Sequence, residues 1–233
     1  NTLTYDNKKL FDGRDKLNVL LGHEVSSSQE TSLENTSVAF PGTMTIDEVL
    51  ANMGAGTALP TQTTISAKDN MLSFFGRVNY TLMDKYLLTV TVRADGSSKF
   101  AKGNQWGVFP SAALAWRLSD EAFMKGTQDW LSNLKVRLSY GTAGNNRISS
   151  GLMYTTYTMA GNTGKAPFFD ETRGAMLEHG SNLYNPNLKW EQSATANFGV
   201  DFSFFNGRLN GTVEYYNTHT KDLLVKRSLN ASL

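Results

Sequence analysis

Apolar and polar residues alternate along this sequence over stretches of ten or more positions. Between residues 85 and 95, every second side chain from Tyr86 to Ala94 is apolar, and Thr89 and Arg93 lie between them. Successive side chains of a β-strand point to opposite faces, so such a segment has one apolar and one polar face. We predict an all-β fold with eight such strands, near residues 1–6, 15–27, 71–82, 85–97, 107–118, 133–142, 190–204 and 208–221.

The length of these strands separates two kinds of all-β protein. Strands of soluble proteins most often have about 5–6 residues, whereas a tilted strand that crosses a membrane needs about 9–11. A soluble β-sandwich or binding module would also have to cover roughly several hundred Å² of exposed Leu, Val and Phe. The pattern therefore favours an antiparallel transmembrane β-barrel in outer-membrane lipid, and it ranks the soluble alternative last.

The connections between the predicted strands are short and long in turn. The short ones are Met83-Asp84, 120–132 and 205–207, and the long ones are 28–70, 98–106 and 143–189. Outer-membrane barrels have short periplasmic turns and longer extracellular loops, so the alternation predicts the orientation of every strand. Phe123, Met124 and Trp130 predict a small interfacial helix in the 120–132 connection.

Composition and motifs argue against several classes of function. The 22 basic residues nearly balance the 21 acidic ones, which gives no electrostatic reason to expect nucleic acid as a partner. The chain has no cysteine, and its three histidines, His23, His179 and His219, are far apart in sequence. No nucleophile elbow, P-loop or zinc-binding spacing is present. We therefore predict no enzymatic activity, no metal and no cofactor.

Most charged residues of the predicted strands occupy the alternate positions that form the polar face. They include Arg77, Arg93, Asp95, Arg117, Arg137, Asp201 and Glu214, together with Glu24 and Lys135. On a lipid face, each Arg or Lys would cost about 2–4 kcal/mol near the bilayer midplane, so these side chains are predicted to face a polar lumen. Eight strands alone enclose an interior just wide enough for side chains, whereas a larger, plugged barrel accommodates such residues more easily.

Aromatic residues near the strand ends predict girdles at the two membrane interfaces. Tyr86, Trp130 and Phe204 fall near the predicted periplasmic ends of their strands. Near the predicted outer ends lie Phe109, Tyr140 and Trp190. Ordinary core packing is an equally good interpretation for any one of these rings.

An ordered set of segments resembles one known family. These are F-G-R-V-N-Y at 75–80, K-Y-L-L-T-V-T-V-R-A-D-G-S-S-K-F at 85–100, W-G-V-F-P-S-A-A-L-A-W-R at 106–117, L-K-V-R-L-S-Y-G-T-A-G-N-N at 134–146, N-P-N-L-K-W-E at 185–191, V-E-Y-Y-N at 213–217 and K-D-L-L at 221–224. Together they cover essentially the whole chain in the right order, and they resemble the SusC/RagA family of TonB-dependent outer-membrane transporters.

The resemblance implies a 22-stranded barrel with a plugged lumen, driven by the TonB system and paired with a SusD-like surface lipoprotein. It also implies import of oligosaccharides or, in some members, peptides. Neither the plug domain nor the family's final strand is matched. We therefore expect residues 1–233 to be a partial TonB-dependent receptor β-barrel domain, with the plug domain and C-terminal strands absent. We also expect an open sheet whose unpaired edges lie near 1–6 and 208–221.

Aromatic loop residues are the candidates for binding a sugar ring by stacking. Those proposed to face substrate are Trp106, Tyr154, Tyr157, Phe168, Phe169 and Tyr184. For each one, packing within the loops or against the lipoprotein is the favoured interpretation. Two other functions stay open. One is a structural or adhesive outer-membrane barrel that binds a partner through its long loops. The other is a self-contained eight-stranded barrel, which as an enzyme would need a catalytic constellation that the sequence lacks.

Overall fold

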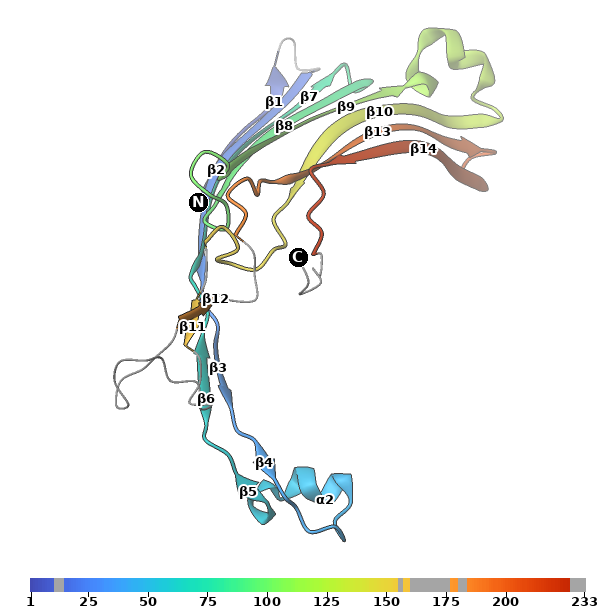
Figure 1. Cartoon of the computed structure of the whole chain (residues 1–233). Coiled ribbons are helices and arrows are strands. Elements are labelled where there is room, and N and C mark those ends of the chain that lie inside the picture. The colour runs from blue at the N-terminus through green and yellow to red at the C-terminus, as the bar shows by residue number, and fades with distance from the viewer. Residues whose placement is uncertain (11–14, 155–156, 160–176, 180–183, 227–233) are drawn as a thin grey trace. The chain divides into compact units, whose positions relative to one another are not determined.

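The computed structural model describes residues 1–10, 15–154, 157–159, 177–179 and 184–226. Eight strands form one antiparallel sheet in the order β1-β2-β7-β8-β9-β10-β13-β14 (Figure 1). Their bounds are β1 Thr2–Leu10, β2 Asp15–Ser28, β7 Asp69–Leu82, β8 Tyr86–Ser97, β9 Trp106–Arg117, β10 Leu131–Asn145, β13 Glu191–Phe204 and β14 Leu209–Lys221. All eight predicted strands are confirmed. The expected open sheet is confirmed too, because β1 and β14 each pair on one side only among the described residues.

The strand register gathers the apolar residues on one face. Leu114 on β9 lies opposite both Leu88 on β8 and Leu138 on β10. On the neighbouring pair, Val200 on β13 lies opposite Val213 on β14. Leu114, Leu138 and Val213 are 51%, 57% and 64% exposed. We call this side of the sheet the apolar face and the opposite side the polar face.

Two tight turns close the shortest connections. Met83 and Asp84 both have positive φ, 53° and 58°, and the Lys85 amide donates to the Leu82 carbonyl at 3.0 Å. Phe205 and Asn206 repeat this geometry between β13 and β14, with φ values of 52° and 53°. Positive φ at both central residues is the requirement of a type I′ turn, whose twist matches that of the flanking strands.

Aromatic rings lie over glycines of the neighbouring strand in two cross-strand pairs. Gly96 on β8 lies opposite Trp106 on β9, and a Cβ at position 96 would stand 3.0 Å from the indole ring. Gly211 on β14 lies opposite Phe202 on β13, and a Cβ there would stand 2.4 Å from Cζ. A side chain at either glycine would require the opposite ring to shift.

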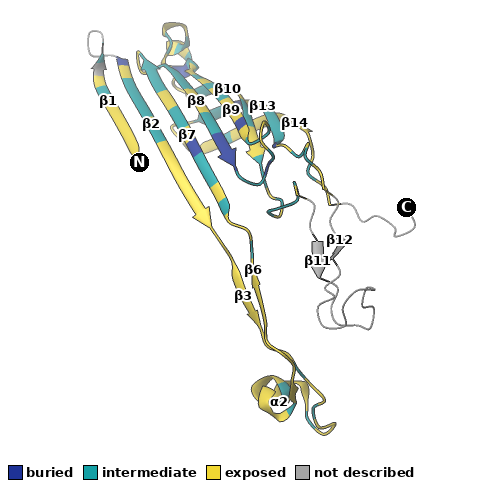
Figure 2. Cartoon of the chain, turned by 60° about the vertical axis from the view of Figure 1, so that its left-hand side comes forward, coloured by how far each residue is buried: buried dark blue, intermediate teal, exposed yellow. Residues whose placement is uncertain are grey.

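Residues 27–69 form a separate unit, which we call the arm. Its strands are β3 Thr31–Glu34, paired with β6 Gln62–Ile65, and β4 Ser37–Val38, paired with β5 Thr57–Ala58. Helix α2, Ile46–Ala51, and the 3₁₀ turn η1, Met53–Ala55, lie between β4 and β5. The sequence predicted a long connection over residues 28–70, and the structure shows these short elements within it. Every residue of the arm is exposed or only partly buried, as the yellow and teal colouring in Figure 2 shows.

The connection between β9 and β10 contains two short 3₁₀ helices, η2 Leu118–Asp120 and η3 Ala122–Thr127. This agrees with the small helix predicted there. Trp130 at the end of the connection stacks on Phe204, with ring centroids 5.8 Å apart. In the 143–189 connection, β11 Tyr157–Met159 pairs with β12 Leu177–His179. None of the helices in the described parts of the chain is long and apolar enough to span a bilayer.

Candidate functional site

The polar face carries all seven charged residues that the sequence analysis assigned to the lumen. Arg77 lies opposite Thr91, Arg93 opposite Phe75, and Asp95 opposite both Ser73 and Gly107. Farther across the sheet, Lys135 is paired with Arg117 and with Asp201, while Gly199 is paired with Arg137 and with Glu214. The register therefore brings Arg77, Arg93, Asp95, Arg117, Arg137, Asp201 and Glu214 to one side of the sheet.

Arg93 is the centre of a polar cluster on β2, β7 and β8. Its Nε donates to both carboxylate oxygens of Asp95, at 2.7 and 2.9 Å. Its terminal nitrogen donates to Ser73 Oγ at 3.0 Å and lies 3.5 Å from Glu24 Oε2. The guanidinium also stands over the Phe75 ring, 5.6 Å from the centroid. Because Asp95 is only 7% exposed, Arg93 supplies the charge that keeps this carboxylate compensated.

Replacing Arg93 tests the importance of this cluster. We expect Arg93→Met to lower the free energy of unfolding by about 1–3 kcal/mol, because it leaves a buried carboxylate without its donor. The Arg93 side chain is itself 36% exposed, and solvent screening keeps the loss below that of a fully buried pair. Urea titration of the folded parent protein would measure the change. Arg77→Met is the matched control, since among the described residues Arg77 has a hydrogen bond to Thr91 and no carboxylate partner; equal losses in the two variants would contradict the assignment.

Arg137 centres a second cluster, on β10, β13 and β14. One terminal nitrogen donates to Asp201 Oδ1 at 2.9 Å and to Glu214 Oε1 at 2.5 Å. Lys135 Nζ lies 3.7 Å from Asp201, and the Thr212 hydroxyl donates to the same carboxylate at 3.0 Å. Two cations thus meet two anions, which fixes the side chains of three strands on the polar face.

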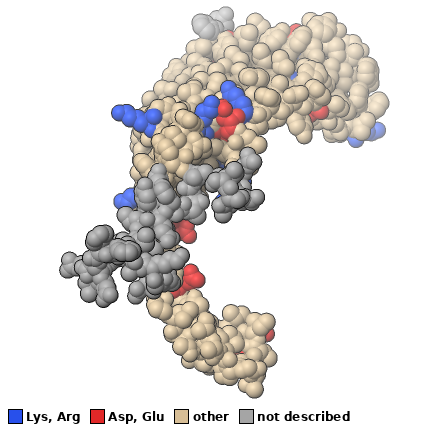
Figure 3. Space-filling model, in the orientation of Figure 1, with Lys and Arg blue, Asp and Glu red and all other residues tan. Residues whose placement is uncertain are grey.

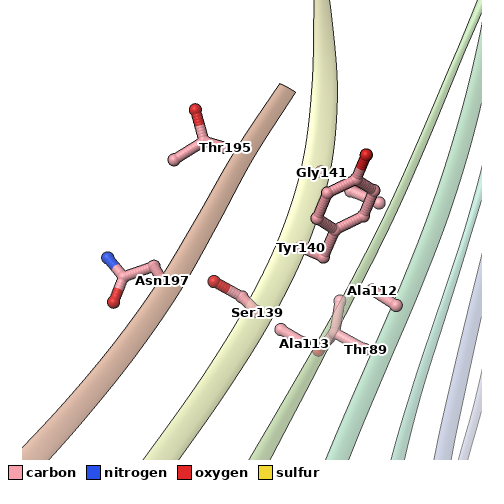
Figure 4. Close-up of a pocket in the computed structure, with 9 residues that line it drawn as sticks. Thr89, Ala112, Ala113, Ser139, Tyr140, Gly141, Thr195 and Asn197 are labelled. Carbon is pink, nitrogen blue, oxygen red and sulfur yellow. The ribbon is translucent and has the colours of Figure 1, made fainter. Parts of the chain in front are cut away.

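Between the two clusters the polar face is hollowed over small side chains. A depression of about 320 Å³ is lined mainly by Thr89, Ser111, Ala113, Ser139, Thr195 and Asn197, most of which Figure 4 shows. A second one, of about 230 Å³, continues from it toward Arg137 and Leu87. In the described part of the chain, Arg77 and Arg117 have no acidic partner near these hollows. The floor offers hydroxyl and amide groups for hydrogen bonding and contains no catalytic group.

The end of the sheet with the long connections holds the hydrophobic core of the described residues. Phe100, Phe109 and Trp190 are 0%, 6% and 5% exposed. The Trp190 ring lies 5.5 Å from Phe100 and 5.4 Å from Phe109, measured between centroids, and its Nε1 donates to the Gln105 carbonyl at 2.8 Å. Phe109 and Trp190 were expected in an aromatic girdle at the outer membrane interface. They lie instead in this buried cluster, because the connections that follow β8 and β10 enclose them.

The candidate substrate-facing aromatics fall in different environments. Trp106 belongs to β9 and stacks on Phe74 of the apolar face, with centroids 6.3 Å apart. Tyr154 and Tyr184 are 62% and 52% exposed in the 143–189 connection. Tyr157 lies in β11, and Phe168 and Phe169 lie outside the described residues. The stacking role of these residues stays a prediction.

The end of the sheet with the short connections has an ordered polar site of its own, which the sequence analysis missed. Glu121 accepts hydrogen bonds from the Tyr86 hydroxyl at 2.7 Å, from Lys85 Nζ at 3.0 Å and from Trp116 Nε1 at 3.1 Å. The hydrogen bonds from Tyr86, Lys85 and Trp116, in that order of effect, lower the pKa of Glu121 from 4.5 to about 2. In the sequence, Ser119-Asp120-Glu121 indicates only the start of the small helix predicted in this connection.

This pKa predicts an acid-sensitive stability. Because the pKa of Glu121 is lower in the folded protein, its contribution is complete above the unfolded value of 4.5. It is lost as the pH falls from there toward about 2. We expect Glu121→Gln to melt at a lower temperature than the wild type at pH 7, and the two melting temperatures to converge as the pH falls below 4.5. Thermal melts from pH 7 to pH 3 check this, with exposed Asp129→Asn as the control; a difference that stays constant with pH would contradict it.

The described residues hold no group of three or more His, Asp or Glu side chains that could bind a metal ion. The polar face instead combines paired charges with hydroxyl-lined hollows. Such a surface can solvate or contact a polar partner.

Comparison with known proteins gives consistent matches across the chain. The profile of the family described as "TonB dependent receptor-like, beta-barrel" matches residues 2–233. TonB-dependent receptor SusC of Bacteroides thetaiotaomicron is 41% identical over 164 residues, which are 70% of this chain and 16% of SusC. TonB-dependent receptor P3 of Formosa agariphila is 34% identical over 229 residues, 98% of this chain and 22% of the receptor.

Solved structures agree with these relatives. The RagAB peptide importer in its "closed-closed" state superposes with a TM-score of 0.76 at 27% identity, over 95% of this chain and 23% of the importer chain. The RagAB peptide transporter superposes with the same TM-score at 26% identity. The chain thus spans less than a quarter of the length of these proteins, 16% of SusC and 23% of the importer chain.

Proposed function

We propose, because this chain belongs to the TonB-dependent receptor-like β-barrel family, that it forms part of the wall of an outer-membrane importer of oligosaccharides or peptides. The observation that carries the proposal is the family match over residues 2–233, which includes all eight strands of the sheet. Membership of the family also supports a location in the bacterial outer membrane.

The two faces of the sheet differ in the environment that each would meet in the membrane. The apolar face would meet lipid, since a cation there would cost about 2–4 kcal/mol near the midplane. The polar face, with Arg77, Arg93 and Arg137, would line the lumen. Tight turns such as Met83-Asp84 would then lie on the periplasmic side, and the arm would lie outside the cell.

The partners follow from the same membership. A plug domain elsewhere in the parent protein would contact the TonB system, and a SusD-like lipoprotein would close over the extracellular mouth. The family resemblance of the sequence implies oligosaccharides, and the likeness to the RagAB peptide importer keeps peptides in the proposal. Exposed Tyr154 and Tyr184 are the described aromatics best placed to stack on a cargo.

Growth of a deletion strain tests this function. Cells that lack the parent gene should fail to grow on at least one member of a panel of oligosaccharides and peptides supplied as sole carbon source. The intact gene should restore growth, and a gene whose TonB-contacting segment is deleted should not. Unchanged growth and uptake on every member of the panel would instead favour the structural or adhesive barrel.

A further inference from the structure

The two hollows of the polar face form one continuous trough. Both are lined by Thr89, Ala113 and Ser139, which lie opposite one another on β8, β9 and β10. We call the combined surface the wall trough. Ser139 and Asn197, which stand on adjacent strands in Figure 4, make no side-chain hydrogen bond to any described residue. Their polar groups are therefore available to a ligand in the trough.

The carboxylates of the two polar clusters are already paired with cations. The pairs are Glu24 and Asp95 with Arg93, and Asp201 and Glu214 with Arg137. Figure 3 shows a similar meeting of basic and acidic atoms near the middle of the side in view. Within the described ranges, Arg77 and Arg117 have no carboxylate at ion-pair distance. The polar face thus keeps two cations whose charge nothing described compensates.

Arg77 brings the first of these charges to one end of the wall trough. Its Nε donates to Thr91 Oγ1 at 3.2 Å, so the guanidinium reaches across from β7 to β8. Thr91 lies directly opposite Ser111, which lines the trough. The Arg77 side chain is exposed, and its other donors have no partner among the described residues. These donors can bind an anionic group at this end.

Arg117 brings the second charge to the other end. It lies directly opposite Lys135, and like charges in this position destabilise a pair of strands. Lys135 lies 3.7 Å from Asp201, but Arg137 shares that carboxylate. Arg137 lines the trough, and its Nε is buried without a hydrogen-bond partner among the described residues. An anionic ligand here would relieve the repulsion between neighbouring cations.

The separation of the two ends indicates the size of the ligand. Ser111, at the level of Arg77, and Arg117 belong to the same strand, β9, and lie about 20 Å apart along it. A ligand that spans this distance is a chain of several sugar or amino-acid units. The guanidinium fork of arginine matches the two oxygens of a carboxylate, so carboxylate is the anionic group that the trough favours.

We propose that the wall trough is a cargo subsite, in which Arg77 and Arg117 bind carboxylate groups of an extended cargo. This inference rests on the function proposed above and narrows its cargo to chains that carry a carboxylate. A peptide with a free C-terminus and an oligosaccharide that contains uronic acids both do so. The hydroxyl and amide groups of Ser139 and Asn197 would bond to the polar groups along the chain.

Uptake of matched cargo pairs by cells of the parent strain tests the subsite. Each peptide of the growth panel is paired with its C-terminal amide, and each oligosaccharide of uronic acids is paired with its carboxyl-reduced form. The peptides contain no Asp or Glu. We expect wild-type cells to import the acid member about tenfold faster than the neutral member at limiting concentration. The pair that shows this preference identifies the source of the carboxylate.

Variants of the two arginines show whether the trough causes this preference. In the double variant Arg77→Gln and Arg117→Gln, the acid member should enter about tenfold more slowly, while the neutral member stays within about twofold. The double variant Arg77→Lys and Arg117→Lys keeps both charges and should recover part of the preference. Arg208→Gln is the matched control. Arg208 is exposed between β13 and β14, outside the trough, and its loss should leave the preference unchanged.

The outcomes separate this inference from the function on which it rests. Wild-type cells that import both members of every pair equally, or only neutral members, would overturn the subsite and leave the importer intact. A preference that persists in the double glutamine variant would overturn it too. Equal slowing of both members in that variant would instead assign the arginines to holding the plug or the wall. Wild-type cells that import no member of the panel would overturn the import function itself.

Discussion

Trp190→Ala is expected to cost about 3–5 kcal/mol of local stability, the range for truncating a large buried aromatic. Trp190 is 5% exposed, and the change removes its contacts with Phe100 and Phe109 together with its hydrogen bond to the Gln105 carbonyl. The cavity left between the two phenylalanines cannot close without moving the connections that cover it. A loss of this size opens the long-connection end of the sheet without unfolding the rest.

Hydrogen exchange of the parent protein detects such local opening. Amides in residues 98–109 should exchange about a hundredfold faster or more in Trp190→Ala, the factor that corresponds to about 3 kcal/mol. Trp190→Phe keeps a ring in place and should lose less. Tyr184→Ala removes a ring that is 52% exposed in the same connection and should leave exchange nearly unchanged. Similar acceleration of exchange in Tyr184→Ala and Trp190→Ala would contradict this prediction. It would show that the cluster around Trp190 is not the core of the long-connection end of the sheet.

Leu138→Arg is expected to destabilise the protein in lipid by about 2–4 kcal/mol, whereas Ser139→Arg should change stability by less than about 1 kcal/mol. The two positions are adjacent on β10 and point to opposite faces. Leu138 is 57% exposed and lies between Leu114 and Phe198 on the apolar face. Ser139 borders the hollow of the polar face, where a guanidinium can stay hydrated (Figure 4).

Folding into phospholipid vesicles at increasing urea concentration gives the comparison, with the wild type measured alongside. The contrast between neighbours is the informative quantity, because both variants add the same side chain to the same strand. Equal destabilisation by the two, or a larger effect at Ser139, would reverse the assignment of the faces.

The strands and their two faces could be predicted because they depend on local periodicity. A period of two over residues 85–95 determines which side chains share a face, and the observed pairing of Leu88 with Leu114 follows once the strands are adjacent. The tight turns were predicted for the same reason, since Phe205-Asn206-Gly207 lies between two alternating segments.

The features that escaped prediction depend on contacts between distant residues or on very short elements. Alternation placed Phe109 near the end of its strand, but only the fold brings Gln105 to Trp190, 85 positions away in sequence. The strands of the arm have two to four residues, too few for a period of two to be recognised. Glu121 gains its donors because a turn returns it to Tyr86 and Trp116, and no spacing in the sequence marks that meeting.

The rings that lie over glycines restrict which substitutions the neighbouring strands can accept during evolution. At Gly96 with Trp106 and at Gly211 with Phe202, a methyl group on one strand would occupy the space of the ring on the next. The glycine can therefore gain a side chain only if the ring shifts or is replaced by a smaller residue. Substitutions at the two positions should be inherited together, with a smaller residue replacing the ring in lineages where the glycine has gained a side chain. Such paired changes would leave a co-variation signal between adjacent strands that records their register.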